Sequence, residues 1–589
     1  MTAHRLFRSA NQFLRKALKR RSGIALPKAR ALALFLAVFI PLIGWPQTAL
    51  GDTTEIAAVG NPNNPAALAG QVADAYRAGA HLIIINPGTY RLPATGHTTF
   101  ELDRWQNVVI RAYHVTLIMA APNGGDCFDL SHCRNVTIEG PTISQAQVTF
   151  YQGRVVKMAK TSKGFYCDWR PDAGYPVPTA ANTSNRSLYF NLFNVVDGRT
   201  RRLKVGDGDL WVTSWTPLAD HTFRLQFHTS LPNLAVGDWL VARYMDAPQK
   251  VRLFFSRDCT IKDVTLMRNG FAPILEWHGG GNHLLGCRWV LGPKPEGATA
   301  APVVTNEADG FHSVNAHPGP DIEHGIFQGV FLDDCIAIHG ELQHVVAASG
   351  RTITVKDNRD AGLLVAEPIQ ISSDNGFFAN AWVVAINTGT NGTSIVTLDR
   401  KLDVPVGAYV TNPNRCGSNY KIIDCRLGDT RSRGIIVKGS NGVIIGNIIR
   451  GCGMAGISIG PEISPGQWWE AGYCRNVIVE DNTLIDNGKD GYNRAVLVHG
   501  SYYSPPNKGA IGNSGIVIKH NTFISNYGGD IWIQWTRSGD ISDNVMTGPP
   551  LLPATGNRRP PSITSDHCDS IHVGQNHITN PFNYAPNHV

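Results

Sequence analysis

The sequence predicts an all-β protein: a right-handed parallel β-helix that carries two inserted small β-barrel modules. Two observations carry this prediction. Short apolar units recur at the length of one solenoid coil, and two long stretches interrupt that recurrence. The composition agrees, because 60 glycines and 35 prolines among 589 residues favour many short strands joined by turns and disfavour long helices.

The first 51 residues have the composition of an export signal. They hold nine Lys or Arg and no acidic residue, followed by an apolar run from Ala31 to Trp45 and the small-residue end Ala49-Leu50-Gly51. The run is shorter than the ~20 residues that a membrane-spanning helix needs, so residues 1–51 are expected to be a cleaved signal peptide. A retained anchor is the alternative. We expect a secreted or periplasmic protein without stable membrane insertion after the leader is removed.

Charge and cysteine content narrow the classes of partner. Without the nine basic residues of the leader, 44 Lys and Arg face 46 Asp and Glu, so no basic excess indicates a nucleic-acid partner. The eleven cysteines are odd in number and lack the close paired spacing of a zinc site. Several lie beside strand-like segments, where we expect small buried fillers: Cys259, Cys287, Cys425 and Cys474.

Residues 52–147 are expected to form an N-terminal cap and the first coils. The stretch PAALAGQVADAYRAG from Pro65 to Gly79 predicts a short helix, and the apolar HLIIINPGTY that follows predicts strand around a Pro-Gly turn. This opening resembles the helical cap and first coil of pectate-lyase-like β-helices. Such a cap covers the open edge of the first coil.

Coil-length repeats predict solenoid over residues 249–340 and 415–589. Units such as CTIKDVTL, KIIDCRLG and GIVIKHNTF begin at Cys259, Lys421 and Gly515, and each is followed by a similar unit 21 to 24 residues later. Asparagines recur at the turn after the first short strand of a unit, where they are expected to form a stacked ladder or to serve the turn itself: Asn447, Asn482, Asn521 and Asn544.

Two stretches break the repeat, roughly Val148 to Pro248 and Glu341 to Asn414. Each contains strand-like runs, such as HTFRLQFHT and SIVTLDRKL, and each ends in a similar phrase, VGDWLVARY or VGAYVTNPN. We therefore expect two small barrels built alike, over residues 148–248 and 341–414, mounted on the solenoid beside a groove.

The most informative residues lie between the two insertions. Asp309 precedes Asp333 by 24 residues and Asp334 by 25, which is the length of one coil, so the three carboxylates should stack about 4.8 Å apart on neighbouring coils. Glycosidic cleavage with inversion needs a protonated acid and an ionised base roughly 6.5 to 9.5 Å apart. Crowded carboxylates meet this need because their pKa values are forced apart and one proton is retained.

Three alternatives to a hydrolase site stay open for these aspartates. They could cap turns and lie in a solvated bend, or serve a non-catalytic glycan-binding solenoid. They could also bind Ca²⁺ as in some β-helix polysaccharide lyases, where an Arg or Lys abstracts the proton. The segment DTRSRGIIVKG offers candidates for such a base: Arg431, Arg433 and Lys438.

Four motifs in order, ADGFH, LDDCIAIHG, TRSRGIIVKG and GISIGPEISPGQWWEAGYCRNV, resemble glycoside hydrolase family 110 from about residue 60 to 550. The resemblance implies an exo-acting, inverting α-1,3-galactosidase on a β-helix with two inserted barrels and no metal. It implies that Asp309, Asp333 and Asp334 are the catalytic aspartates, without dividing acid from base. Ala337 stands where that family carries asparagine, which leaves the sugar open. Family 28 polygalacturonases resemble the chain more distantly and act on an acidic sugar chain.

Further residues are expected to bind the substrate. Trp468 and Trp469 lie in GQWWEAGY, where indole faces could stack on sugars or merely cover the solenoid. The histidines could orient carboxylates, bind hydroxyls or serve turns, and the basic residues could anchor hydroxyls or form surface pairs. The complete set of substrate-binding candidates is His312, His339, Arg431, Arg433, Lys438, Trp468, Trp469 and Glu470.

Other chemistries lack support in the sequence. Glu276, Trp277 and His278 form a weaker candidate group. No P-loop, dinucleotide glycine fingerprint, HExxH or serine-nucleophile elbow is present, so phosphate, nicotinamide, zinc-protease and esterase chemistries are disfavoured. We therefore expect a carbohydrate as the partner and hydrolysis without cofactor or metal.

Overall fold

The structure is a computed structural model that describes residues 56–589 apart from internal gaps and the C-terminal end. The gaps are 121–124, 162–163, 180–191, 205–208, 228–232, 245–247, 357–361, 374–375, 465–467, 492, 501–510 and 549–560, and the end is 580–589. Residues Glu55–Val589 form one compact unit, and the expected leader, 1–51, lies outside the described residues. Among the helices of the described part, none combines the length and apolarity needed to cross a membrane.

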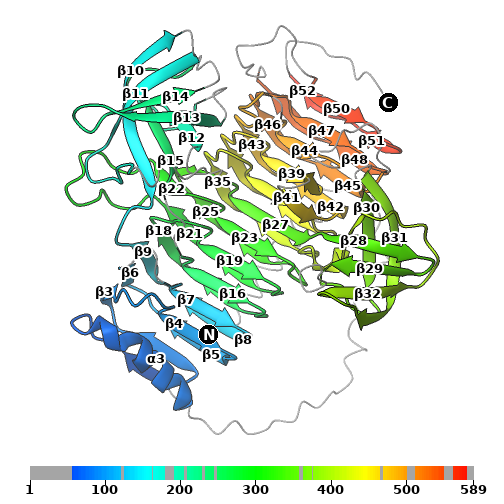
Figure 1. Ribbon diagram of the computed structural model, residues 1–589, viewed down its shortest axis with the longest axis horizontal. Coiled ribbons are helices and arrows are strands. Elements are labelled where there is room, and N and C mark those ends of the chain that lie inside the picture. The colour runs from blue at the N-terminus through cyan, green and yellow to red at the C-terminus, as the bar shows by residue number, and fades with distance from the viewer. Residues whose placement is uncertain are drawn as a thin grey trace, which may run out of the picture. The chain divides into compact units, whose positions relative to one another are not determined.

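The described residues form a right-handed parallel β-helix, as predicted, with three long sheets (Figure 1). The first sheet runs, in spatial order, β1 (Ile56–Val59), β2 (Leu82–Ile85), β5 (Gln106–Arg111), β8 (Arg134–Glu139), β17 (Thr260–Lys262), β20 (His283–Leu285), β24 (Asp321–Glu323), β34 (Lys421–Ile423), β37 (Val443–Ile445), β42 (Arg475–Glu480), β45 (Ser514–Lys519), β48 (Gly539–Ser542) and β51 (Ile571–Val573). The second runs β3 (Gly88–Leu92), β6 (Val115–Met119), β9 (Thr142–Gln145), β18 (Thr265–Met267), β21 (Arg288–Val290), β25 (Ile326–Phe327), β35 (Arg426–Gly428), β38 (Ile448–Arg450), β43 (Thr483–Ile485), β46 (Thr522–Ile524), β49 (Val545–Thr547) and β52 (His577–Ile578).

The third sheet carries the candidate site. Its main path is β4 (Phe100–Asp103), β7 (Phe128–Ser131), β16 (Val251–Phe254), β19 (Ile274–Trp277), β23 (Phe311–Val314), β27 (Ile336–Glu341), β36 (Ile435–Val437), β39 (Ile457–Ile459), β44 (Val496–Val498), β47 (Ile531–Gln534) and β50 (Ile563–Asp566). A hairpin of β40 (Glu462–Ser464) and β41 (Trp468–Ala471) joins it by antiparallel pairing of β41 with the end of β27. A short parallel pair is formed by β22 (Val304–Asn306) and β26 (Val330–Phe331).

The predicted coil length is confirmed by strand register. Thr260 pairs with His283, Lys421 with Val443 and Ile516 with Gly539, which are spacings of 22 or 23 residues. Residues that alternate inward along these short strands form one continuous apolar core through the solenoid. One repeating unit is therefore one coil, and residues one period apart lie on neighbouring coils.

The asparagine ladder is also confirmed. The Asn447 N–H donates to Asn482 Oδ1, the Asn482 N–H to Asn521 Oδ1, and the Asn521 N–H to Asn544 Oδ1, each at 2.9 Å. All four side chains are buried, so each amide satisfies backbone groups that the turn would otherwise leave unpaired. The eleven cysteines, all of them described, are unpaired, and all but Cys568 are fully buried, as expected for small fillers.

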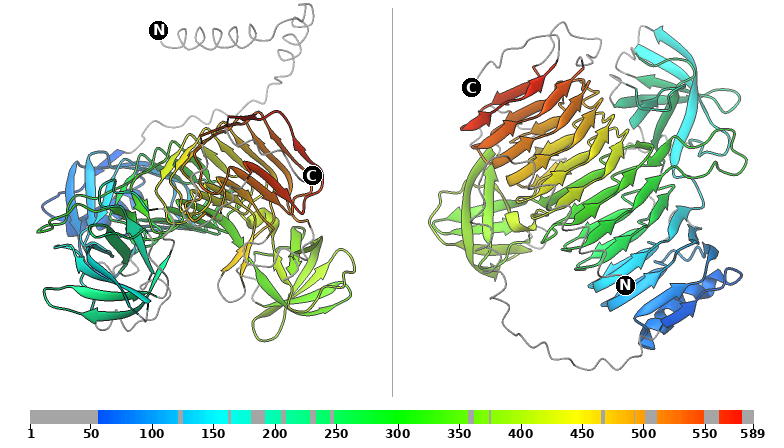
Figure 2. Two further views of the ribbon diagram at one scale, coloured as in Figure 1. Left: turned by 90° about the horizontal axis from the view of Figure 1, so that it is seen from above. Right: turned by 180° about the vertical axis from the view of Figure 1, so that it is seen from behind.

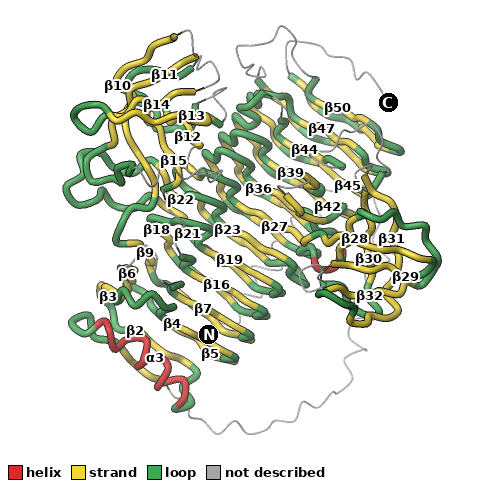
Figure 3. Tube along the Cα trace, in the orientation of Figure 1, coloured by secondary structure: helices red, strands yellow, loops and turns green. Residues whose placement is uncertain are grey.

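A helical cap begins the solenoid, as the sequence predicts. The 3₁₀ turn η1 (Pro65–Ala67) leads into α3 (Leu68–Arg77), the red helix of Figure 3, which lies beside β1 and β2. Its buried residues Leu68, Val72 and Ala75 recur at helical spacing and face the first coil. The helix thus covers apolar surface that the first coil would otherwise expose.

Both insertions are closed barrels with one topology. Barrel 1 consists of β10 (Phe150–Thr161), β11 (Gly164–Pro171), β12 (Leu192–Val196), β13 (Leu210–Pro217), β14 (Phe223–Phe227) and β15 (Trp239–Arg243). Barrel 2 consists of β28 (Gln343–Ser349), β29 (Thr352–Lys356), β30 (Pro368–Ser373), β31 (Gly376–Thr388), β32 (Thr393–Leu398) and β33 (Tyr409–Thr411), and is followed by the 3₁₀ turn η2 (Pro413–Arg415).

In both barrels the strands close in the chain order first, second, fifth, fourth, third, sixth, which confirms that the two modules are built alike. Both project from the same side of the solenoid, with the sheet that holds β23 and β27 between them (Figures 1 and 2). The two similar phrases of the sequence form the last strand of each barrel, β15 and β33.

Candidate functional site

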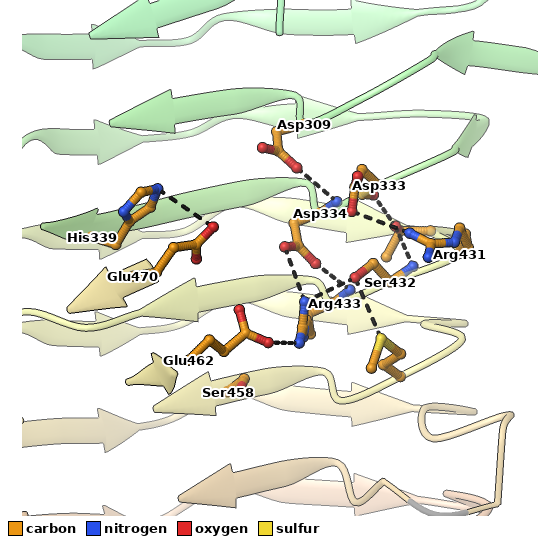
Figure 4. A network of polar contacts seen from close by, with 12 residues as sticks. Asp309, Asp333, Asp334, His339, Arg431, Ser432, Arg433, Ser458, Glu462 and Glu470 are labelled. Atoms are coloured by element: carbon orange, nitrogen blue, oxygen red, sulfur yellow. Dashed lines mark hydrogen bonds and ion pairs between the residues drawn. The ribbon is translucent and has the colours of Figure 1, made fainter. Parts of the chain in front are cut away.

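The three aspartates come together at the start of two adjacent strands of the third sheet. His312 of β23 pairs with Ala337 of β27, and the same offset aligns Asp309 with Asp334. The Asp334 N–H donates to Asp309 Oδ1 at 3.0 Å, and on the next coil the Arg433 N–H donates to Asp334 Oδ1 at 2.7 Å. Each coil therefore fixes the carboxylate of the coil before it (Figure 4).

One carboxylate oxygen from each of Asp309, Asp333 and Asp334 can be chosen so that the three lie within 4.8 Å of one another. Since each carboxyl carbon is about 1.2 Å from its oxygens, the carbons lie no more than about 7 Å apart. This bound overlaps the lower end of the inverting range and also includes the shorter spacing of retaining enzymes. The three carboxylates thus lie close together, as the sequence predicted.

Asp333 is held by two arginines, one of them from barrel 1. Arg243, at the end of β15, places Nη2 2.9 Å from Asp333 Oδ2, and Arg431 places Nη1 3.3 Å from Oδ1. Arg431 also makes a paired contact with Asp209 at 2.6 and 2.7 Å. Burial and neighbouring Asp309 raise the pKa of Asp333 above its ordinary value, although Arg431 and Arg243 oppose the shift.

Asp334 is the aspartate with the clearest tendency to hold a proton. Burial raises its pKa to about 7, Arg433 opposes this, and Asp333 and Asp309 add to it. The Arg433 guanidinium is 3.5 Å from Asp334 Oδ2. Near neutral pH the crowded carboxylates therefore share at least one proton, as general acid catalysis requires.

Two histidines continue the cluster on the same sheet. His312 Nδ1 contacts Asp309 Oδ2, and His312 Nε2 is 2.9 Å from His339 Nε2. His339 Nδ1 lies 2.9 Å from the carbonyl oxygen of Gly340. Burial lowers the pKa of His312, but the hydrogen bond and charge of Asp309 outweigh it and raise that pKa overall. Burial lowers the pKa of His339 to about 4.

A buried network of charges closes the site into a ring. Lys438 Nζ contacts Glu470 and lies 3.0 Å from Glu462 Oε2, and Arg433 also contacts Glu462. Glu470 Oε1 is 3.9 Å from His339 Nε2. Burial works against charge on Lys438, yet Glu462 and Glu470 raise its pKa. The contacts run from Asp309 through the two histidines, Glu470, Lys438, Glu462 and Arg433 to Asp334. Figure 4 shows part of this ring, with His339 beside Glu470 and with Glu462 beside Arg433 and Asp334.

These contacts refine the expected substrate-binding set. Both ring nitrogens of His312 and of His339 are engaged by protein groups, so the positioning role fits them better than direct binding of sugar hydroxyls. Lys438 is fully buried and Arg433 nearly so, which places both under the carboxylates and out of reach of a sugar. Arg431 and Glu470 keep about a fifth of their side chains exposed and remain candidates for contact.

Of the two tryptophans, Trp468 and Trp469, the structure describes the side-chain contacts of Trp469 alone. Trp469 packs against His344 and Tyr409 of barrel 2, with ring centroids 4.6 and 4.8 Å away, which agrees with the alternative of an apolar cover. The side chain of Trp468 lies outside what the structure describes. The weaker candidate Glu276 is a fully buried carboxylate that accepts hydrogen bonds from Asn282 and Ser313, both at 2.6 Å, so it stabilises the solenoid interior.

Sequence reasoning missed three members of the site: Arg243, Asp209 and Glu462. The first two belong to barrel 1, and no coil-length repeat connects an insertion to the solenoid face on which it docks. Arg243 ends VGDWLVARY, a phrase that indicated only barrel architecture. Glu462 lies in the GPEISPG segment of the resembling motif, which was the one signal for it.

A cavity of about 180 Å³ adjoins the cluster between barrel 1 and the solenoid. Arg431 lies in its wall and contacts Asp333, so this side chain separates the cavity from the carboxylates, none of which lines it. The basic residues of the wall are paired, since Lys204 lies 2.6 Å from Asp238 and Lys489 lies 3.6 Å from Asp429. The polar and charged lining consists of Asn194, Lys204, Asp209, Arg431, Lys489 and Asp490.

The aspartate cluster is a poor fit for calcium. Ca²⁺ takes six to eight oxygen ligands, whereas the oxygens of Asp333 and Asp334 already face the guanidinium groups of Arg243, Arg431 and Arg433. A divalent cation would have to approach through three positive charges. The donor set therefore favours proton chemistry over metal binding.

Comparison with known proteins gives no family. No family model matches the chain, and no curated protein matches it. The resemblance to family 110 therefore stays a prediction.

The solved structures that are similar include the A-module of mannuronan C-5 epimerase AlgE6 from Azotobacter vinelandii, at 12% identity and TM-score 0.40, covering 87% of this chain and 94% of that one. The catalytic domain of a GH87 α-1,3-glucanase matches at 9% identity and TM-score 0.35, covering 92% and 71%. The family 28 exopolygalacturonase of Yersinia enterocolitica matches at 10% identity and TM-score 0.34, covering 88% and 79%. At such values nothing about substrate follows, and the site geometry has to carry the functional conclusion.

Proposed function

We propose that the chain is a secreted or periplasmic inverting glycoside hydrolase that removes terminal α-1,3-linked galactose with an aspartate acid–base pair and water. The observation that carries the proposal is the cluster of Asp309, Asp333 and Asp334. One oxygen from each lies within 4.8 Å of the others, and the pKa values of Asp333 and Asp334 are raised. The sugar and linkage come from the sequence resemblance to family 110. The location comes from the composition of residues 1–51.

In this proposal one proton on Asp333 or Asp334 goes to the glycosidic oxygen as its bond to the anomeric carbon breaks. Asp309 takes a proton from water, whose oxygen forms the new bond on the opposite face of the sugar. The product is free sugar with inverted configuration. Asp309 then releases its proton to solvent, and Asp333 or Asp334 regains one from solvent. Asp334 is buried and Asp309 and Asp333 are partly buried, which strengthens these electrostatic effects because few water dipoles screen them.

Charge pairing favours a neutral sugar over a uronic acid. Each described cation at the cluster and the cavity wall already has a carboxylate partner, as Arg431 has Asp209, Lys438 has Glu462 and Lys204 has Asp238. A substrate carboxylate would have to displace one of these partners. The polygalacturonase-like alternative is therefore less well supported than a hydrolase of neutral glycans.

The lyase alternative needs a base among the cations. Burial disfavours charge on Arg431, but Asp209 and Asp333 raise its pKa overall, and carboxylates likewise raise the pKa of Lys438. Both residues therefore stay protonated and cannot abstract a proton. Together with the poor calcium fit, this leaves acid–base hydrolysis as the chemistry that the site supports best.

The test is proton NMR of the protein acting on an α-1,3-linked galactose disaccharide with EDTA present. Early release of β-galactose, lost in Asp333→Asn and Asp334→Asn, is the expected result. Asp103→Asn removes an exposed carboxylate from an early coil of the same sheet and should leave release unchanged.

Other outcomes each overturn part of the proposal. Early α-galactose would mean retention. Intact disaccharide would remove α-galactosidase activity, and a screen of uronic-acid polymers with calcium would then test for lyase or polygalacturonase-like action through an ultraviolet-absorbing product or new reducing ends. Sugar binding without any product would indicate a non-catalytic glycan-binding solenoid.

A further inference from the structure

We infer that His339 is a positioning residue that fixes one proton between Asp309 and His312, so that Asp309, His312 and His339 form a single hydrogen-bonded unit of zero net charge beside the acidic pair. This inference rests on the proposed function for its catalytic consequence, but not for the proton arrangement itself.

The arrangement starts at the backbone of β27. His339 Nδ1 lies 2.9 Å from the Gly340 carbonyl oxygen, and a carbonyl oxygen can only accept, so Nδ1 carries a proton. His339 is nearly fully buried, and burial lowers its pKa to about 4, which makes the ring neutral over most of the pH range. Nε2 of His339 is therefore an acceptor.

The next contact is set by the first. His312 Nε2 is 2.9 Å from His339 Nε2, and two ring nitrogens at this distance need one proton between them. Because His339 Nε2 accepts, His312 Nε2 must donate. The two rings meet nearly at right angles, at 83°, with centroids 4.9 Å apart, which agrees with an edge-on hydrogen bond and not with stacking.

The last contact must then hold a proton as well. With Nε2 protonated, a neutral His312 would turn a bare Nδ1 towards Asp309 Oδ2, and two lone pairs would repel at hydrogen-bonding distance. A proton therefore lies between them, as imidazolium with carboxylate or as imidazole with carboxylic acid. Three contacts hold three protons, and either form has zero net charge.

The charged groups around His312 agree with this count. Asp309 on the same coil and Glu470 on β41 raise the pKa of His312, whereas burial and Lys438 lower it, and the balance is upward. Burial, together with His312 and Lys438, lowers the pKa of the His339 ring. Glu470 Oε1, 3.9 Å from His339 Nε2, raises that pKa, but the balance is downward, so His339 stays neutral. Lys438, fully buried behind Glu470, keeps that carboxylate ionised.

The unit has a catalytic consequence. A protonated His312 contacts Asp309 Oδ2, while Asp309 Oδ1 accepts the Asp334 N–H at 3.0 Å. Both oxygens are held, so the orientation of the carboxylate is fixed. Removing the acceptor at position 339 would free the His312 ring to exchange tautomers. Its shared proton would then be lost at lower pH, and Asp309 would lose its orientation.

The test compares His339→Leu with His339→Gln. Leucine offers no acceptor, whereas the glutamine side-chain oxygen can still accept from His312 Nε2. We expect His339→Leu to lower kcat at least about tenfold with KM nearly unchanged and to move the alkaline limb of the pH profile to lower pH. His339→Gln should keep most of the parent's kcat and leave the alkaline limb of the pH profile near its position in the parent. His324→Leu, which removes an exposed histidine, should match the parent.

A second measurement needs no substrate. Nitrogen-15 NMR of the full-length protein with labelled histidine should show His312, assigned by loss of its signals in His312→Gln, with a proton on Nε2 and a second proton shared between Nδ1 and Asp309 at neutral pH. His339 should be protonated at Nδ1 alone. A His312 Nε2 without a proton would overturn the inference even in an active hydrolase. If the signals agree but no glycoside is cleaved, the proton arrangement stands and the proposed function fails. Equal kinetics and pH profiles for the leucine and glutamine variants would overturn the positioning role.

Discussion

The two barrels share one strand order yet contribute to the candidate site in different ways. Barrel 1 sends charged side chains directly into it, because Arg243 contacts Asp333 and Asp209 contacts Arg431. Among the described residues, barrel 2 acts through packing on the β40–β41 hairpin, where Trp469 lies against His344 and Tyr409 and the next residue is Glu470. Barrel 1 thus supplies charged side chains to the site, and barrel 2 supports the hairpin that carries Glu470.

The difference can be located in the last strand of each barrel. When VGDWLVARY and VGAYVTNPN are aligned without gaps, Arg243 corresponds to Pro413. At that point barrel 1 presents a guanidinium to the site, whereas barrel 2 begins the 3₁₀ turn η2, with Pro413 at its first position and Asn412 accepting the Asn414 N–H at 3.1 Å. Two barrels with the same strand order can therefore carry residues with different functions at the position where the chain leaves the barrel.

The largest expected effect comes from breaking the direct link of barrel 1. Arg243→Met should lower kcat about 10- to 100-fold, because Asp333 loses a charge-assisted hydrogen bond worth about 1.5–3 kcal/mol. Steady-state kinetics checks this against Lys157→Met, which removes an exposed charge from β10 of the same barrel. Equal activity of the two variants would show that barrel 1 does not tune the site.

A second effect concerns the pH dependence of stability, which should have opposite signs for Asp334 and for Glu470 on the barrel 2 side. The folded pKa of Asp334 is raised to about 7, so its contribution is fully present below the unfolded value near 3.8 and is lost as pH rises to about 7. Asp334→Asn, which keeps an acceptor for the Arg433 N–H, should therefore be more stable than the parent above pH 7, by at least about 1 kcal/mol, with the difference vanishing towards pH 4. Urea unfolding at both pH values measures this, and a variant less stable at pH 8 would contradict it.

Glu470, on the barrel 2 side, should behave in the reverse sense. Burial works against its charge, but His339 and Lys438 lower its pKa below the ordinary 4.5, so its contribution is present above that value and is lost on acidification. Glu470→Gln should lose stability at pH 7 and lower kcat about tenfold through the weakened Lys438 contact. Glu296→Gln removes an exposed carboxylate as the control. A Glu470 variant as stable as the parent at pH 7 would contradict the lowered pKa.

Periodicity explains what the sequence could predict. Asp309 and Asp334 lie one coil apart, and any right-handed solenoid of that period brings such residues together, so the cluster needs no knowledge of tertiary contacts. Arg243 and Asp209 reach the same cluster only because barrel 1 docks on the solenoid, and no repeat encodes docking. The two roles of Trp469 could not be separated for the same reason, since the sequence of a loop does not show whether its aromatic side chain contacts a sugar or a neighbouring barrel.

The smallest expected effect tests the packing of barrel 2 against the β40–β41 hairpin. Trp469→Ala removes a half-buried indole from the contact with His344 and Tyr409, which should cost about 1–3 kcal/mol of stability, less than full burial would imply. Because Glu470 keeps its backbone pairing to Glu341 of β27, kcat should fall by no more than about threefold. Trp382→Ala, which removes an exposed indole from β31 of the same barrel, should change neither quantity. Thermal unfolding and kinetics together decide the point: a large loss of kcat or a raised KM with unchanged stability would mean that Trp469 contacts the sugar after all.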